Sequence, residues 1–261
     1  MSNRLSSSFR IQLRTVLALL LREMLTRYGR HNIGFLWLFV EPMLFTLGVT
    51  ALWTATKSVH GSNLPIVAFA LTGYSSVLLW RNMPSRCIMS VTHNLSIMNH
   101  RNIKIIDIYL SRILLEAAGA TISFVVLSLV FIAIGWIEPP ESVLQIAYGW
   151  MMLALFGMAL AFFLGALSEQ FETVEKLWHP ASYLLFPLSG AAFLVDSLPR
   201  AAQDFVLALP MVHGVEMIRE GYFGAQINAI YDAGYMAASI MLLLFLGLLQ
   251  IRRISKDVVP E

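Results

Sequence analysis

Six long apolar runs, separated by polar segments, constrain this chain more than any other feature. Each run approaches the roughly 20 residues that a helix needs to cross a bilayer. Hydrocarbon offers no partner to backbone N–H and C=O groups, and the strands of a membrane β-barrel would be shorter and would alternate in polarity. We therefore predict an all-α integral membrane protein with six transmembrane helices within residues 34–251. The runs are Gly34–Thr54, Leu64–Trp80, Ile113–Trp136, Val143–Leu167, Leu177–Val195 and Tyr235–Ile251.

The composition excludes several other classes of protein. Hydrophobic residues make up 57% of the 261 residues and charged residues 13%, whereas soluble domains are about 45–50% apolar and about 25% charged. A net charge of +2 is too small to indicate a nucleic-acid partner. Cys87 is the only cysteine, which excludes a disulfide framework.

The distribution of basic residues predicts the orientation. Most of the 18 lysines and arginines lie before the first run, in residues 81–112, or in the tail 252–261. The positive-inside rule places these segments in the cytoplasm, so both termini are cytoplasmic and the number of crossings is even. Glu169, Glu172 and Glu175 make the loop before the fifth run acidic, but acidic residues count little in this rule.

Two segments outside the runs have patterns of their own. Residues 1–33 carry apolar side chains at helical spacing, with Arg10, Arg14 and Arg22 on other faces, which predicts an amphipathic helix on the inner leaflet. The alternative is a solvated lead-in. Residues 196–234 are interrupted by Pro199 and Pro210, which predicts short re-entrant helices on the external side; an ordinary external loop is the alternative.

Three motifs resemble one protein family, the polysaccharide-exporting ABC-2 permeases, and most closely the inner-membrane subunit of bacterial capsular polysaccharide exporters. The first motif is Arg27-Tyr28-Gly29-Arg30, followed by Ile33-Gly34-Phe35-Leu36-Trp37 and by Glu41-Pro42. The second is Ser197-Leu198-Pro199, followed by Leu209-Pro210-Met211-Val212-His213-Gly214-Val215-Glu216 and Arg219-Glu220. The third is Ile106-Asp107, followed by Arg112 and Leu114-Leu115-Glu116.

The resemblance implies a transporter permease of the bacterial inner membrane rather than an enzyme. Two copies would pair around a channel, and two copies of a separate ATPase would drive export of a lipid-linked capsular polysaccharide. An O-antigen or another glycolipid is the alternative substrate. Periplasmic and outer-membrane partners would continue the path. The chain has no G-x-x-x-x-G-K-[ST] motif, so ATP and Mg²⁺ are expected on the partner and no cofactor on this chain.

The resemblance also suggests functional residues. It places Phe35, Trp37, Phe39, Glu41 and Phe45 beside the channel, and it places Arg27 and Arg30 at the interface, facing phosphate groups. For the aromatic residues the alternative is an interfacial belt, and for Glu41 it is pairing with a nearby arginine or a backbone donor. The belt would include all six tryptophans, because each lies toward the end of a predicted span: Trp37, Trp53, Trp80, Trp136, Trp150 and Trp178.

The loop 81–112 is expected to couple to the ATPase through a helix over Ser85–Ser96. The stripe of that helix that would enter a partner cleft is Cys87, Ile88, Val91 and Leu95. A plain cytoplasmic connector is the alternative, and the amphipathic N-terminal helix is the competing docking surface.

Other kinds of site are disfavoured. An intramembrane protease could use Ser189 and His213, but Ser189 lacks a G-x-S turn. A proton-coupled carrier needs ionisable residues near mid-span, and only Glu41 comes close. His179, His213 and Glu216 are expected on opposite membrane sides, so we expect no metal site. Gly157, Ala161 and Gly165 predict close helix packing within the chain.

Overall fold

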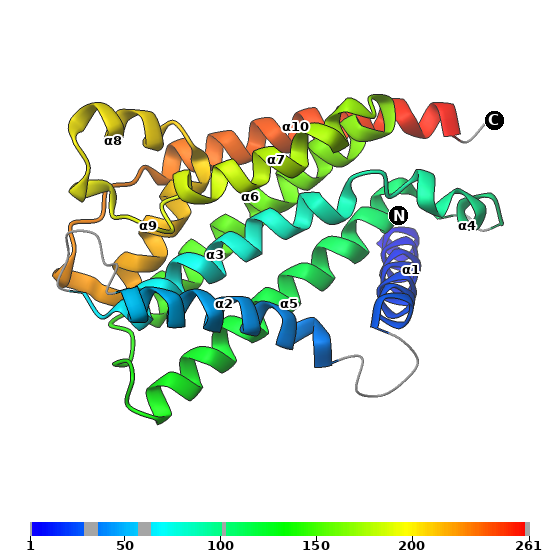
Figure 1. Ribbon diagram of the computed structural model, residues 1–261. Coiled ribbons are helices and arrows are strands. Elements are labelled where there is room, and N and C mark those ends of the chain that lie inside the picture. The colour runs from blue at the N-terminus through cyan, green and yellow to red at the C-terminus, as the bar shows by residue number, and fades with distance from the viewer. Residues whose placement is uncertain (1, 29–35, 57–63, 101–102, 259–261) are drawn as a thin grey trace.

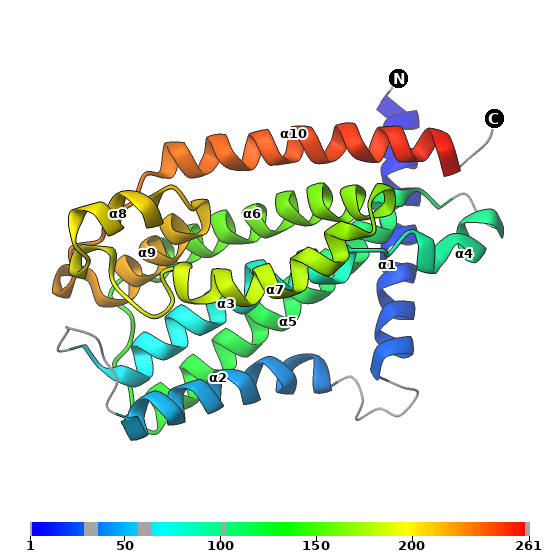
Figure 2. The same ribbon diagram turned by 45° about the horizontal axis from the view of Figure 1, so that its top comes forward.

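The computed structural model describes residues 2–28, 36–56, 64–100 and 103–258, and all regular structure in these segments is helical. A long helix, α1 (Ser2–Tyr28), crosses one end of a helix bundle (Figure 2). The all-α class is confirmed, and each predicted apolar run overlaps one helix of the bundle. The bundle consists of six long helices lying side by side (Figure 1): α2 (Trp37–Thr56), α3 (Ile66–Cys87), α5 (Ile105–Ala133), α6 (Val143–Gln170), α7 (Thr173–Leu188) and α10 (Ala233–Val258).

In the described residues, four helices are long and apolar enough to cross a membrane, namely α2, α5, α6 and α10. The helix α3 also carries Arg81, Asn82 and Arg86, and most of its residues are buried. The helix α7 has 16 residues and contains Pro180 and Pro187. Six crossings therefore remain a prediction, in which α3 is shielded from lipid by its neighbours.

The centre of the bundle is the contact between α3 and α6. Thr72 and Ser76 of α3 are buried, and their hydroxyls donate to carbonyls of their own helix, which satisfies these polar groups away from water. On α6, Gly157 faces the backbone of Trp80 and Gly165 faces Cys87. The row of small residues thus packs within the chain, as predicted.

The two ends of the bundle differ in charge. The helix α1, the short helix α4 (Leu95–His100) and the C-terminal end of α10 lie at one end, which we call the basic end (Figures 1 and 2). The helices α8 (Arg200–Leu207) and α9 (Pro210–Phe223) lie at the opposite end. The basic end carries Arg81, Arg86, Lys104, Arg112, Lys176, Arg252 and Arg253, and the opposite end carries Glu138, Glu141, Asp196, Asp204 and Asp232.

Both ends of the described chain lie at the basic end, which fits an even number of membrane crossings. That the basic end is cytoplasmic remains a prediction.

The N-terminal helix has two apolar sides. Val16 and Leu19 are buried in the protein. A row of leucines spaced four residues apart remains exposed, namely Leu13, Leu17, Leu21 and Leu25. Because α1 lies across the bundle, this row suits contact with a membrane surface, in keeping with the predicted interfacial helix.

The segment between α7 and α10 is held by two buried charged residues of α9. The Arg219 guanidinium donates to the carbonyls of Gly190, Ala191 and Phe193 and lies 3.8 Å from the Phe69 ring centroid. The Glu216 carboxylate accepts the backbone N–H groups of Val195 and Ile230, at 3.3 and 3.2 Å. The predicted short helices in this segment are confirmed as helices, while their depth in the membrane remains a prediction.

We predict that Gly157→Val lowers the stability of the protein. A Cβ at this position would lie 2.9 Å from Met83 Sδ and 3.0 Å from Trp80 Cα, so α3 and α6 would have to move apart. Overpacking of this kind costs about 1–3 kcal/mol. The midpoint temperature of aggregation in detergent should fall by several degrees. Gly48→Val is the control, because a Cβ at Gly48 meets nothing within 4 Å; equal stability of the two variants would contradict the prediction.

Candidate functional site: a charged cavity at the basic end

A polar cavity of about 210 Å³ opens between α1, α2, α3, α5 and α7. We call it the charged cavity. Five of its lining side chains are ionisable, three arginines and two glutamates: Arg27, Arg81, Arg86, Glu41 and Glu116. Leu38, Phe45, Leu78 and Tyr183 form part of its apolar wall. A charged hollow of this kind among helices that cross a membrane is costly unless water, protein or a charged ligand fills it.

Glu116 lies at the centre of this charge cluster. Its side chain is 7% exposed, and its Oε1 accepts a hydrogen bond from Arg27 Nη1 of α1 and lies 3.2 Å from Arg86 Nε of α3. One carboxylate on α5 therefore binds α1 and α3 together. Removing one partner from a buried ion pair typically costs about 3–5 kcal/mol, because the other charge is left uncompensated.

The same three helices meet again one turn away. Arg112 of α5 donates to the Arg86 carbonyl at 2.6 Å and lies 3.4 Å from a carboxylate oxygen of Glu23 on α1. Asp107 accepts the Lys104 N–H at the start of α5 and an amide hydrogen of Gln12. The third sequence motif, Asp107 to Glu116, is thus the side of α5 that binds α1 and the end of α3.

Arg81 differs from the other two arginines of the cavity. In the described part of the chain, its guanidinium forms no ion pair within 4.0 Å, and it lies 5.3 Å from the ring centroid of Tyr183 on α7. A cation that borders a cavity without a carboxylate partner is a natural contact for an anionic ligand. The sequence marked Arg81 only as one of many basic residues.

The predicted channel residues on α2 have one face in common. Trp37, Glu41 and Phe45 are spaced four residues apart, and Trp37 and Phe45 are 52% and 56% exposed. Glu41 and Phe45 line the charged cavity. Glu41 Oε2 lies 3.9 Å from Arg27 Nη2, which confirms the alternative that Glu41 pairs with an arginine. Phe39 is half-buried, and its carbonyl accepts a hydrogen bond from Ser123 of α5. Phe35 and Arg30 lie outside the described residues.

An interfacial belt requires exposed tryptophans, and only some of the tryptophans meet this condition. Trp37 and Trp136 are exposed, but Trp80 and Trp178 are buried inside the protein. Trp80 packs against Phe156 of α6, and the Trp178 indole N–H donates to Ser85 Oγ at 2.9 Å. For these two residues the belt interpretation is wrong, because neighbouring helices cover positions that look terminal in the sequence.

The segment expected to couple to an ATPase has a different form from the one predicted. The helix α3 continues to Cys87, and Met89 then adopts a left-handed conformation with φ 53°. A helix over Ser85–Ser96 is therefore wrong. Cys87 and Val91 are 0% and 1% exposed, so neither can enter a partner cleft as an exposed anchor. Ile88 is half-buried and Leu95 is exposed at the start of α4. An apolar stripe at helical spacing predicts burial, and here the chain itself provides the covering surface.

The end of α6 holds this segment in place. Glu169 Oε1 accepts the Val91 N–H at 2.8 Å, and Glu169 Oε2 accepts the Thr92 N–H and hydroxyl at 3.1 and 2.6 Å. Ser168 Oγ accepts the Met89 N–H at 3.0 Å. The sequence marked Glu169 only as part of an acidic loop.

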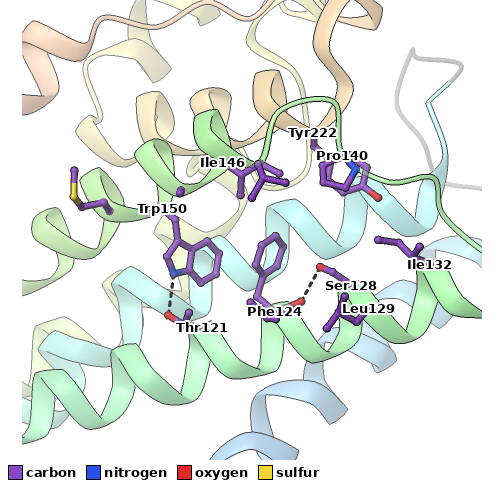
Figure 3. Close-up of a pocket in the computed structure, with 13 residues that line it drawn as sticks. Thr121, Phe124, Ser128, Leu129, Ile132, Pro140, Ile146, Trp150 and Tyr222 are labelled. Atoms are coloured by element: carbon purple, nitrogen blue, oxygen red, sulfur yellow. Dashed lines mark hydrogen bonds between the residues drawn. The ribbon is translucent and has the colours of Figure 1, made fainter.

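A second cavity, of about 430 Å³, lies between α5 and α6 under Tyr222 of α9. Figure 3 shows Phe124 and Trp150 next to each other on its wall, where their rings are stacked with centroids 4.6 Å apart. The Trp150 indole N–H donates to Thr121 Oγ1 and the Ser128 hydroxyl to the Phe124 carbonyl, at 2.9 and 2.7 Å. None of the described residues that line this cavity carries a charge, so its walls suit hydrocarbon.

The residues of the disfavoured sites have other partners. Asp232 N–H donates to His213 Nδ1 at 2.9 Å, so Nε2 carries the hydrogen and donates to the Leu207 carbonyl at 2.8 Å. Burial also lowers the pKa of His213. The Ser189 hydroxyl donates to the Phe186 carbonyl at 2.7 Å. Both ring nitrogens of His213 are thus occupied by backbone groups, which leaves no lone pair for a serine or a metal.

Comparisons with known proteins agree with the sequence motifs. Residues 14–223 match the family described as ABC-2 type transporter. Over 254 residues, the chain is 42% identical to the capsule polysaccharide export inner-membrane proteins BexB of Haemophilus influenzae and CtrC of Neisseria meningitidis serogroup B, covering 97% of this chain and 96% of each relative. The polysialic acid transport protein KpsM of Escherichia coli is 27% identical over 245 residues, 93% of this chain and 94% of KpsM.

We predict that Glu116→Ala destabilises the protein strongly. It leaves Arg27 and Arg86 without their shared carboxylate, and a loss of about 3 kcal/mol corresponds to roughly 5–10 °C in the midpoint of thermal unfolding. The matched control is Glu41→Ala, which removes the more exposed partner of Arg27 at 3.9 Å. A pair of that kind contributes about 0–1 kcal/mol. If both variants unfold at the same temperature in detergent, Glu116 does not hold the three helices together.

Proposed function

This chain belongs to the ABC-2 type transporter family, and we propose that it is the inner-membrane permease subunit of a capsular polysaccharide exporter. The observation that carries this proposal is its 42% identity, over nearly the whole length, to capsule polysaccharide export proteins. The charged cavity and the exposed aromatic face of α2 supply chemistry that suits such a substrate, because phosphate and sugar hydroxyls bind cations, while sugar C–H faces stack on aromatic rings.

The pathway would form between two copies of the chain. Trp37, Leu44 and Phe45 of α2 and Leu177, Tyr183 and Leu184 of α7 are exposed in the single chain. The charged cavity lies between these two helices, bordered by Phe45 and Tyr183. A second copy placed on this face would cover the apolar side chains and would separate the charged cavity from lipid, which otherwise makes its charges costly.

Arg81 is the residue that we assign to the anionic part of the substrate. A lipid-linked glycan bears phosphate or carboxylate groups near its anchor, and Arg81 is the cation of the cavity that has no carboxylate partner among the described residues. Arg27 is engaged with Glu116 and Glu41, so its role is to shape the cavity. The aromatic face of Trp37 and Phe45 would then contact the sugar chain weakly, so that the chain could slide along it without being bound tightly at one position.

The energy for transport would come from a separate ATPase that binds ATP and Mg²⁺. Its docking surface is assigned to a groove of about 770 Å³ between α1 and the segment around α4. The groove is lined by Ile11, Arg14, Thr15, Ala18, Leu19, Arg22, Ile97 and Ile103. Apolar residues with two arginines suit an amphipathic element that carries acidic side chains. At the opposite end, α8 and α9 would face the periplasmic and outer-membrane partners.

We predict that deleting this chain from its host leaves the polysaccharide inside the cell. Polysaccharide extracted from intact cells and from lysates should show surface export restored by the wild type, but only when the ATPase is also present. Arg81→Gln should insert and assemble normally yet reduce export about tenfold or more, the magnitude of one charge-assisted hydrogen bond. Arg253→Gln, an exposed arginine at the same end of the bundle, is the control. Export that persists without the ATPase and stops with a protonophore would overturn the proposal in favour of a proton-coupled carrier.

We further predict that Ile97→Asp prevents the purified permease from retaining the ATPase. Truncating an anchor in such a groove costs about 1–3 kcal/mol, and burying an unpaired charge adds to that. Ile11→Asp, on the α1 side of the groove, should have the same effect. Val91→Asp is unsuitable, because Val91 is buried within the chain and its replacement would disrupt the fold.

The control for the docking prediction is Thr173→Asp. This residue is exposed at the start of α7, where a negative charge favours the helix N-terminus. Retention of the ATPase by Ile97→Asp and Ile11→Asp, measured by co-purification, would show that the groove is not the docking surface.

A further inference from the structure

The turn between α3 and α4 is bonded to the bundle mainly through the end of α6. After Cys87, the chain passes Met89 and a short 3₁₀ helix, Thr92–Asn94, before α4 begins at Leu95. Glu169 accepts three hydrogen bonds from Val91 and Thr92, and the neighbouring Ser168 accepts a fourth from Met89. Bonds to an ionised carboxylate are about twice as strong as bonds between neutral groups, so the joint is stiff.

The turn also borders the groove assigned to the ATPase. Asn94 accepts a hydrogen bond from Arg22 of α1 at 2.9 Å and donates to the Ser90 carbonyl at 2.8 Å. Arg22 and Ile97 line the groove on its two sides. A displacement of an ATPase element in this groove would therefore reach the turn directly.

The helix α6 extends from this joint to the opposite end of the bundle. Its first turn meets α9, where the Ser142 N–H donates to the Gly221 carbonyl at 2.8 Å. Gly149 of α6 faces Met217 and Ile218 of α9, and a Cβ at Gly149 would lie 2.8 Å from Met217 Cβ. Such close packing allows little relative motion between the two helices. A movement of α6 at Glu169 would therefore be transmitted to α9, the helix that holds the segment between α7 and α10.

We propose that Glu169 is the positioning residue that passes ATP-driven movement from the turn to α6. This inference rests on the proposed function, because it requires an ATPase that docks beside the turn. Without the three bonds, the end of α6 would keep only the Ser168 bond to Met89, so the turn could move with the ATPase while α6 followed less. ATP hydrolysis would then continue without a matching export of substrate.

The test compares export with ATP hydrolysis in the complete permease–ATPase complex. Glu169→Ala should retain the ATPase and hydrolyse ATP, but export per ATP hydrolysed should fall about fivefold or more, which corresponds to a coupling free energy of about 1 kcal/mol. Glu169→Gln keeps an acceptor oxygen and should lie between Ala and the wild type. Glu172→Ala is the matched control: Glu172 belongs to the same acidic loop, and its side chain caps no backbone group of α7.

A milder variant covers the case in which Glu169→Ala fails to fold. Thr92→Val removes only the hydroxyl that bonds Glu169, with little change in shape, and should lower export per ATP about twofold. In a Glu169→Ala background it should have no further effect, because the hydroxyl has already lost its partner.

The outcomes separate this inference from the proposed function. Unchanged export per ATP in both Glu169→Ala and Thr92→Val would overturn the role of Glu169 while the wild type still exports with its ATPase. Loss of the ATPase on purification of Glu169→Ala would also overturn it, because Glu169 would then only shape the docking surface. A wild-type complex without ATP-dependent export would instead show that the proposed function is wrong.

Discussion

The ion pairs of Glu116 with Arg27 and Arg86 are the interaction on which the basic end of this protein depends. Each charge would be costly alone among membrane helices, and together they hold α1 and α3 against α5. Together with the Arg112–Glu23 pair, the Arg27–Glu116 bond holds α1 across the end of the bundle, and it forms part of the wall of the charged cavity. Arg81 keeps its cationic side chain beside that wall, and no carboxylate in the described segments pairs with it.

Two further charged side chains, Glu169 and Arg219, hold other parts of the bundle together. Glu169 joins the end of α6 to the turn after α3, and Arg219 joins α9 to the chain that leaves α7. Each is a charged side chain that binds backbone groups of another element, so it fixes a loop without adding an unpaired charge. The proposed cycle uses this framework: an ATPase moves the turn, α6 moves with it, and the proposed pathway between two copies changes its width.

The sequence predicted the helices better than it predicted the site. Long apolar runs require helices in a membrane, and each of the six runs overlaps a helix, although the fifth run, Leu177–Val195, is α-helical only to Leu188. The stripe of Cys87 and Val91 was misread, because helical spacing of apolar residues predicts a covered face without telling whether the same chain covers it. Glu116 appeared only as part of the third motif, and its pairing was not predicted because its partner Arg27 lies far away in the sequence. Trp80 looked like an end residue because the charges that follow it seemed to end the helix, which in fact continues to Cys87.

The central claim is that the charged cavity receives the anionic end of a lipid-linked glycan, and cross-linking within the cavity tests it most directly. Asn82 lines the cavity beside Arg81, and a photo-cross-linking amino acid at this position should capture glycolipid in cells that synthesise the polysaccharide. The same amino acid at Met151, on the wall of the apolar cavity, should capture membrane phospholipid only. Capture of phospholipid alone at Asn82, in cells that are exporting polysaccharide, would contradict the account.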